Sequence, residues 1–158
     1  MFLINEPATD LYFLHHLYRL FLQKKIYLID REEERQFWQK AAAYYVSAGD
    51  AMEGIACYRK CEDYQGMLTA INRFMNDQND VTDTTAAYFL EHLDLLPPEQ
   101  QAQYPLVDYL RAYIYMATLQ LKEAEALLLD LVQRLPEDGP PDTRELLGNA
   151  YTTLGAIH

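Results

Sequence analysis

Small and aromatic residues alternate at helical spacing between residues 41 and 61, and this pattern constrains the fold more than any other feature. The residues at steps of three, four and five are Ala42, Tyr45, Gly49, Gly54, Tyr58 and Cys61. Gly49 and Asp50 interrupt the run, and an Asp placed there can accept hydrogen bonds from the free N–H groups of a following helix. The stretch therefore predicts two antiparallel helices joined by a tight turn, with small side chains that let the helices lie close together.

The same spacing recurs further along the chain. Ala42 and Ala112 are 70 positions apart, and Gly148 follows Ala112 by 36 positions. A period of roughly 34 residues built from helix pairs is typical of tetratricopeptide repeats, and the pattern resembles that family. We therefore predict an all-α fold, a right-handed superhelix of antiparallel helix pairs. The expected units are residues 31–62, 63–98 and 99–136, followed by an incomplete unit at 142–158.

Apolar periodicity and turn residues give the expected helices. They cover residues 31–48, 51–61, 64–75, 84–96, 99–118 with an interruption near Pro105, 122–135, and 143–157 with Asp142 as N-cap. Apolar runs at 2–4 and 11–13 fit a small hairpin or the rim of another domain, and a further helix is expected to begin near Asp10. The chain ends where another helix is expected, so we interpret it as a fragment of a longer protein. The stripe of Leu147, Tyr151 and Leu154 would then lack its partner, which makes self-association possible.

The charge is negative and uneven. The formal net charge is −11, and residues 41–158 carry seven Lys or Arg against eighteen Asp or Glu. A surface this acidic repels a phosphate backbone, so direct nucleic-acid binding is not expected. No stretch is apolar enough to span a bilayer, and the run at 1–4 lacks the basic flank of a signal peptide. These features predict a cytoplasmic protein with no membrane partner.

A resemblance to a regulator family rests on the order of several motifs. Residues 11–22 read LYFLHHLYRLFL, residues 41–45 read AAAYY, and Gly49 and the run Glu53, Gly54, Ile55 follow. This order is similar to MalT-like, LuxR-type bacterial transcription regulators, which usually have Trp and Ala where this chain has Tyr and Gly54. The resemblance covers residues 1 to about 75 by motif, and the remainder by repeat type. It implies that residues 1–30 are the end of a winged-helix-like segment with its connecting helix.

The resemblance also implies a function. An upstream module would bind ATP, a downstream helix-turn-helix domain would bind DNA, and the repeats would sense a small-molecule effector, such as a sugar, or a regulatory protein. This stretch contains neither a phosphate-binding G-x-x-x-x-G-K-[ST] loop nor a nucleophile–base pair, so we expect no enzyme activity and no cofactor here. The alternative is a general tetratricopeptide scaffold that binds a peptide or protein and is unrelated to transcription.

The resemblance to tetratricopeptide arrays also implies a groove lined by the first helix of each pair. The expected groove residues are Gln36, Gln39, Tyr64, Met67, Tyr109, Tyr113, Met116, Glu145, Asn149 and Thr152. Aromatic, thioether and amide groups without Lys or Arg suit a sugar, an apolar small molecule or a peptide strand. The alternative is that the Tyr and Met side chains pack between neighbouring helices.

Cysteine and histidine spacing does not indicate a metal site. Cys57 and Cys61 lie one helical turn apart with no second pair, so we expect packed thiols in a reducing compartment. His15 and His16 are adjacent and would point about 100° apart on a helix. His92 belongs to no H-E-x-x-H motif. Structural roles are therefore expected for all five side chains.

Overall fold

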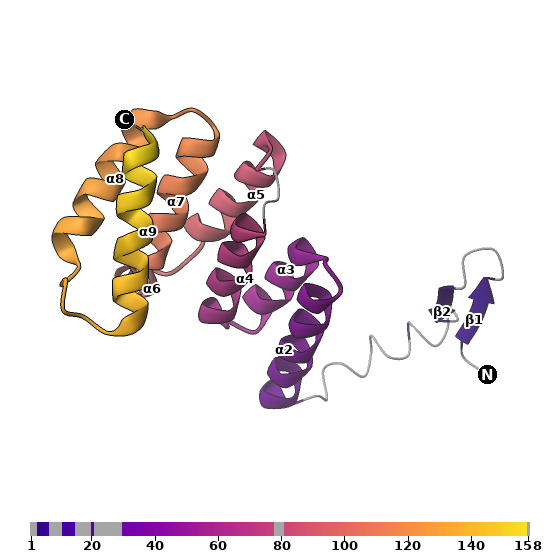
Figure 1. Cartoon of the computed structure of the whole chain (residues 1–158). Helices are drawn as coiled ribbons and strands as arrows, with labels where there is room; N and C mark the ends of the chain where they lie inside the picture. The colour runs from indigo at the N-terminus through magenta and orange to yellow at the C-terminus, as the bar shows by residue number, and fades with distance from the viewer. Residues whose placement is uncertain (1–2, 7–10, 15–19, 21–29, 78–80, 158) are drawn as a thin grey trace. The chain divides into compact units, whose positions relative to one another are not determined.

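The computed structural model describes residues 3–6, 11–14, 20, 30–77 and 81–157, and the chain divides into two units, residues 1–37 and 38–158. In the first unit, β1 (Leu3–Glu6) and β2 (Leu11–Leu14) form an antiparallel hairpin that pairs Leu3 with Leu14 and Glu6 with Leu11 (Figure 1). The hairpin expectation is confirmed. The helix expected from near Asp10 is wrong over 11–14, because aromatic residues favour strands and 3–6 supply a backbone partner. Residues 15–19 and 21–29 of that expected helix lie outside the described residues.

From Asp30 to Ile157, the regular structure of the described residues is helical, so this part of the chain is all-α. The helices are α2 (Arg31–Ser47), α3 (Ala51–Lys60), α4 (Tyr64–Asn76), α5 (Asp83–Asp94), α6 (Pro98–Gln103), α7 (Leu106–Ala117), α8 (Leu121–Arg134) and α9 (Pro141–Ile157). The expected interruption near Pro105 is confirmed, because α6 ends at Gln103 and α7 begins at Leu106.

Short polar side chains and turn residues set the helix ends. The Asp50 carboxylate accepts the N–H of Glu53 at 3.2 Å, which confirms the predicted cap, and Gly49 supplies the turn with φ +88°. Asp63 caps α4 in the same way, through the N–H of Gly66 at 2.9 Å. The cap predicted at Asp142 is wrong because α9 already begins at Pro141, whose fixed φ and missing N–H suit a first helical position.

Small residues bring α2 and α3 close together, as the sequence predicts. Ala42 and Gly54 are buried. A Cβ atom added to Gly54 would lie 2.5 Å from Val46 Cγ2 and 3.2 Å from the carbonyl oxygen of Ala42. The absence of a side chain at residue 54 is therefore what allows this approach.

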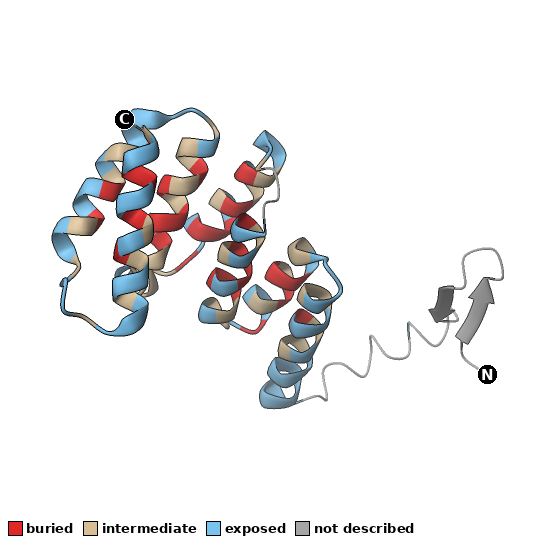
Figure 2. Ribbon diagram, in the orientation of Figure 1, coloured by how far each residue is buried: buried red, intermediate tan, exposed pale blue. Residues whose placement is uncertain are grey.

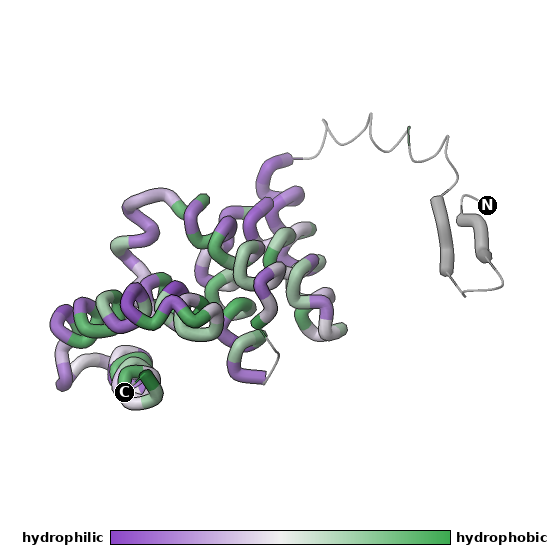
Figure 3. The backbone as a smooth tube through the Cα atoms, turned by 90° about the horizontal axis from the view of Figure 1, so that it is seen from above, coloured by the Kyte–Doolittle hydropathy of each residue, from purple (hydrophilic) through white to green (hydrophobic). Residues whose placement is uncertain are grey.

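The hydrophobic core of the second unit runs between successive helices. Helix α7 packs against α8 and α9, α8 packs against α9, α3 packs against α4, and α4 and α5 both contact α7. Figure 2 shows the buried residues on the faces that these helices turn toward one another, and Figure 3 shows hydrophobic and hydrophilic residues alternating along them. The largest fully buried side chains include Phe89, Met67, Leu110 and Leu128.

The last helix buries most of its apolar stripe. Leu147 and Leu154 are buried, because α7 and α8 cover that face of α9. Tyr151 remains 51% exposed. The expectation of an unpartnered stripe is therefore wrong for the two leucines and holds only for the tyrosine.

Candidate ligand groove

Two cavities lie on either flank of α4. The α4–α9 cavity measures about 370 Å³ and is bounded by α4, the segment before α7, α7 itself, the residue after α8, and α9. Its lining residues are Gln65, Leu68, Thr69, Asn72, Tyr104, Pro105, Leu106, Tyr109, Leu135, Asp142, Thr143, Glu145, Leu146 and Asn149. The α3–α4 cavity measures about 460 Å³ and lies between the end of α2, α3 and α4.

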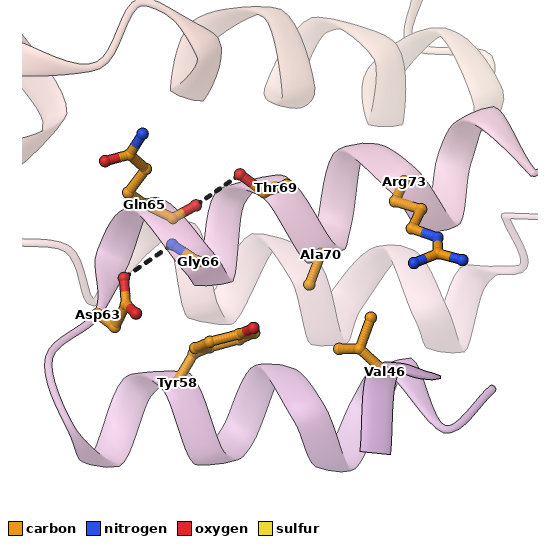
Figure 4. A pocket seen from close by; sticks show the side chains of 8 residues that line it. All are labelled: Val46, Tyr58, Asp63, Gln65, Gly66, Thr69, Ala70 and Arg73. Carbon is orange, nitrogen blue, oxygen red and sulfur yellow. Dashed lines mark hydrogen bonds between the residues drawn. The ribbon is translucent and has the colours of Figure 1, made fainter. Parts of the chain in front are cut away.

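The α3–α4 cavity is drawn in Figure 4. The Tyr58 ring lies below Gly66, and Val46 and Arg73 lie toward the far end of α4. A third cavity of about 270 Å³ continues past Val46 and Arg73 toward the α2–α3 turn. Because Gln65 and Thr69 line both main cavities, the two cavities adjoin along these side chains of α4. We call the two adjoining cavities together the groove.

The rotation of α4 about its own axis decides which of its side chains reach the groove. Gln65, Thr69 and Asn72 lie at steps of four and three and line the α4–α9 cavity. Met67 is fully buried in the core, and Tyr64 is half-buried and packs against it. Neither of these two predicted residues lines the α3–α4 or the α4–α9 cavity. The polar spacing of Gln65, Thr69 and Asn72 was the signal that would have found the groove face of this helix.

Predicted residues on α7 and α9 divide into two groups. Tyr109, Glu145 and Asn149 come together around the α4–α9 cavity. Tyr113 packs against the core with its ring centroid 6.3 Å from that of Tyr109. Met116 is half-buried and Thr152 is exposed, with its hydroxyl donating to the Gly148 carbonyl at 2.9 Å. These last three residues line neither cavity.

The two glutamines predicted on α2 differ in environment. Gln36 is exposed, and its Nε2 donates to Glu32 Oε1 at 3.1 Å. Gln39 is half-buried, and its Nε2 donates to Asp63 Oδ2 at 3.4 Å. Because Asp63 lines the α3–α4 cavity, Gln39 is tied to the edge of the groove without lining it.

The charges around the α4–α9 cavity are negative. Asp142 and Glu145 are its charged residues, and the lining, all within the described part of the chain, contains no Lys or Arg. Two arginines on the neighbouring helices bind carboxylates elsewhere. Arg134 pairs with Asp108 and Asp130, and Arg111 pairs with Asp94.

Tyrosines in and near the groove remain neutral at physiological pH. Burial raises the pKa of Tyr109, which lines the α4–α9 cavity, although a hydrogen bond with Thr153 opposes the shift. Desolvation also raises the pKa of Tyr58, with Asp63 adding to it. Such phenols can donate hydrogen bonds and stack against a ligand, but they do not serve as bases near neutral pH.

The cysteines and His92 are packing residues. Both Cys57 and Cys61 are buried thiols, which confirms the packing prediction, and desolvation raises the pKa of Cys57 despite the opposing effect of Lys60. His92 is buried against the Tyr88 ring at 4.2 Å, with Nδ1 2.9 Å from the Tyr88 carbonyl oxygen. His15 and His16 lie outside the described residues. In the part of the chain that is described, no three potential metal ligands are grouped together.

Comparisons with family models, with curated proteins and with solved structures gave no match to this chain. Within residues 30–77 and 81–157, none of the helices has the length and apolar character needed to cross a membrane.

Proposed function

We propose that this chain is the effector-sensing and protein-interaction repeat region of a cytoplasmic MalT-like, LuxR-type transcription regulator, folded as a tetratricopeptide-like right-handed superhelix. The observation that carries the proposal is the groove. Helices α4, α7 and α9 line the α4–α9 cavity, and they are the helices that open successive units in the sequence pattern. The proposal also uses the motif order in residues 11–55.

The proposed mechanism is a shift between arrangements of the repeats. A ligand in the α4–α9 cavity would contact α4, α7 and α9 together, so its binding free energy would favour one spacing of these helices. That spacing would release an upstream ATP-binding module to oligomerise, and oligomerisation would bring DNA-binding domains together. In this mechanism the repeats supply recognition and no catalysis, because the groove combines amides, carboxylates and neutral phenols without a nucleophile–base pair.

Isothermal titration calorimetry on this chain tests the proposal. The panel should contain sugars, small metabolites, peptides and candidate regulatory proteins, titrated into the wild-type chain. We expect a ligand whose affinity falls at least tenfold in Asn149→Ala, which alters the groove, and is unchanged in Gln133→Ala on an exposed part of α8. Flat heats for the whole panel, or equal loss in both variants, would argue against the groove as the binding site.

A general tetratricopeptide scaffold is the second candidate, and the two adjoining cavities along α4 favour it. An open surface of this kind suits a peptide strand at least as well as a compact metabolite. The gene on both sides of this stretch separates the two candidates. A phosphate-loop motif upstream and a helix-turn-helix motif downstream support the regulator, and the absence of both supports the scaffold.

A further inference from the structure

We propose that the α4–α9 cavity receives the side chain of a Lys or Arg from an extended peptide that follows the groove. This inference rests on the proposed function of the groove as a binding site and adds the chemical class of its occupant.

The charge of the cavity selects a cation. Asp142 and Glu145 lie one helical turn apart on α9 and line the same cavity, with no basic side chain in the lining. In the described part of the chain, neither carboxylate takes part in an ion pair with this protein's own cations. An ammonium or guanidinium group would donate charge-assisted hydrogen bonds to these carboxylates and offset their charge, whereas an anionic group would be repelled by them.

The rest of the lining suits the remainder of a basic side chain. The half-buried Leu106 and Leu146 give the cavity apolar surface against which the methylene groups of Lys or Arg can lie. The half-buried ring of Tyr104 belongs to the same lining, and an aromatic face attracts a cation. Apolar walls, a ring and two carboxylates thus match the stem and the charged end of one side chain.

The extent of the groove selects a peptide over a free amine. Gln65 and Thr69 line both main cavities, so a second cavity adjoins the one that a single side chain would fill. The carboxamides of Gln65, Asn72 and Asn149 each offer a donor and an acceptor, which is what a peptide backbone requires. A small amine would occupy the α4–α9 cavity alone and leave these amides and the α3–α4 cavity unused.

Fluorescence anisotropy on the full chain tests the inference. The probes are labelled heptapeptide mixtures that differ only in one fixed central residue, which is Lys, Arg, Gln or Glu. We expect the Lys and Arg mixtures to bind at least tenfold more tightly than the Gln mixture, and the Glu mixture to bind most weakly. Raising the salt concentration should reduce the preference, because part of the attraction is electrostatic.

Two variants and one matched control locate the binding. Glu145→Gln and Asp142→Asn should each reduce the affinity for the basic mixtures about tenfold and leave the Gln mixture unchanged. Glu137→Gln removes one negative charge from an exposed position outside the cavity, and it should change the affinity little. Circular dichroism melting establishes that each variant is folded. Equal losses in all three variants would show that net charge alone drives binding and would overturn the inference.

The remaining outcomes separate this inference from the proposed function. If free arginine amide binds as tightly as the Arg mixture, the peptide part is wrong and the cavity is a small-cation site. If a sugar binds with loss in Asn149→Ala while the basic peptides do not bind, the inference fails and the groove remains a binding site. If no peptide, amine or sugar binds, both proposals fail.

Discussion

Gly54→Ala tests whether close contact between α2 and α3 requires a residue without a side chain. Two effects oppose each other. Replacing Gly by Ala inside a helix stabilises it by about 1 kcal/mol. Against this, the new Cβ would lie 2.5 Å from Val46 Cγ2, 3.2 Å from the Ala42 carbonyl oxygen and 3.3 Å from the Val46 nitrogen.

The packing cost is the larger of the two effects. Two of the three nearest atoms belong to the backbone of α2, so the contact is relieved only if the helices move apart or Val46 leaves its rotamer. Overpacking of this kind costs about 1–3 kcal/mol. After subtracting the gain in helix propensity, we expect Gly54→Ala to lower the free energy of unfolding by about 1 kcal/mol.

Gly148→Ala is the matched control. Gly148 lies within α9, is exposed, and would place no heavy atom within 4 Å of an added Cβ. Only the propensity gain remains, so this variant should be about 1 kcal/mol more stable than wild type. Urea unfolding followed by circular dichroism should separate the two midpoints by about 1 M, at a slope of about 2 kcal/mol per molar urea. Equal or reversed midpoints would refute the packing argument.

A double variant tests which atoms of α2 cause the loss of stability in Gly54→Ala. In a Val46→Ala background the 2.5 Å contact with Cγ2 no longer exists, and the two backbone contacts above 3 Å remain. Gly54→Ala should then be close to neutral, which corresponds to a coupling of about 1 kcal/mol between the two sites. An unchanged loss in the double variant would place the clash on the backbone instead of the side chain.

Three further predictions concern capping, core packing and pH. Asp63→Ala removes the cap of α4 and should cost about 1 kcal/mol in the same urea assay, whereas Asp83→Ala, beside the cap of α5, should cost less. Phe89→Ala leaves a cavity at the centre of the core and should lower the free energy of unfolding by about 3–5 kcal/mol, which a lower melting temperature would reveal. Burial raises the pKa of Cys57 and of four tyrosines, so the folded chain holds these protons longer than the unfolded chain does. The protonated thiol and phenols therefore contribute fully to the free energy of unfolding below their ordinary pKa values, about 9 for the thiol and 10 for the phenols. This contribution is lost as the pH rises above those values. Melting temperatures that stay level from pH 8 to 11 would contradict this.

Helix limits followed from the sequence where the chain carries unambiguous turn chemistry. Gly49 and Asp50 ended one helix and capped the next because a positive φ and a short carboxylate are local requirements. Pro105 interrupted the segment between residues 98 and 117 for an equally local reason, its missing N–H. At residues 11–14 the sequence supported both a hairpin and the start of a helix, and local reasoning did not choose between them, because the strand depends on pairing with residues 3–6.

The residues that line the groove could be predicted from the sequence only in part. The prediction named Tyr109, Glu145 and Asn149, which lie around one cavity, because aromatic and polar residues on the first helix of each unit are recognisable. It also named Tyr64, which packs against the core, and missed the next residue, Gln65, which is exposed and lines both main cavities. A shift of one residue turns a side chain by about 100° on a helix, so it exchanges a core position for a groove position. That rotation is fixed by contacts of α4 with α3 and α7, which neighbours in sequence do not specify.

Residues at and between helix ends complete the cavity. Tyr104 lies between α6 and α7, and Leu135 follows the last residue of α8, although the expected helices 99–118 and 122–135 included both. The repeats therefore supply a surface of common design, while the segments between them supply the features that differ from one cavity to the next. Tyr104 lines the α4–α9 cavity and not the α3–α4 cavity, although α4 contributes Gln65 and Thr69 to both. Ligand selectivity in such a protein is expected to depend on these connecting residues more than on the small residues that hold the repeats together.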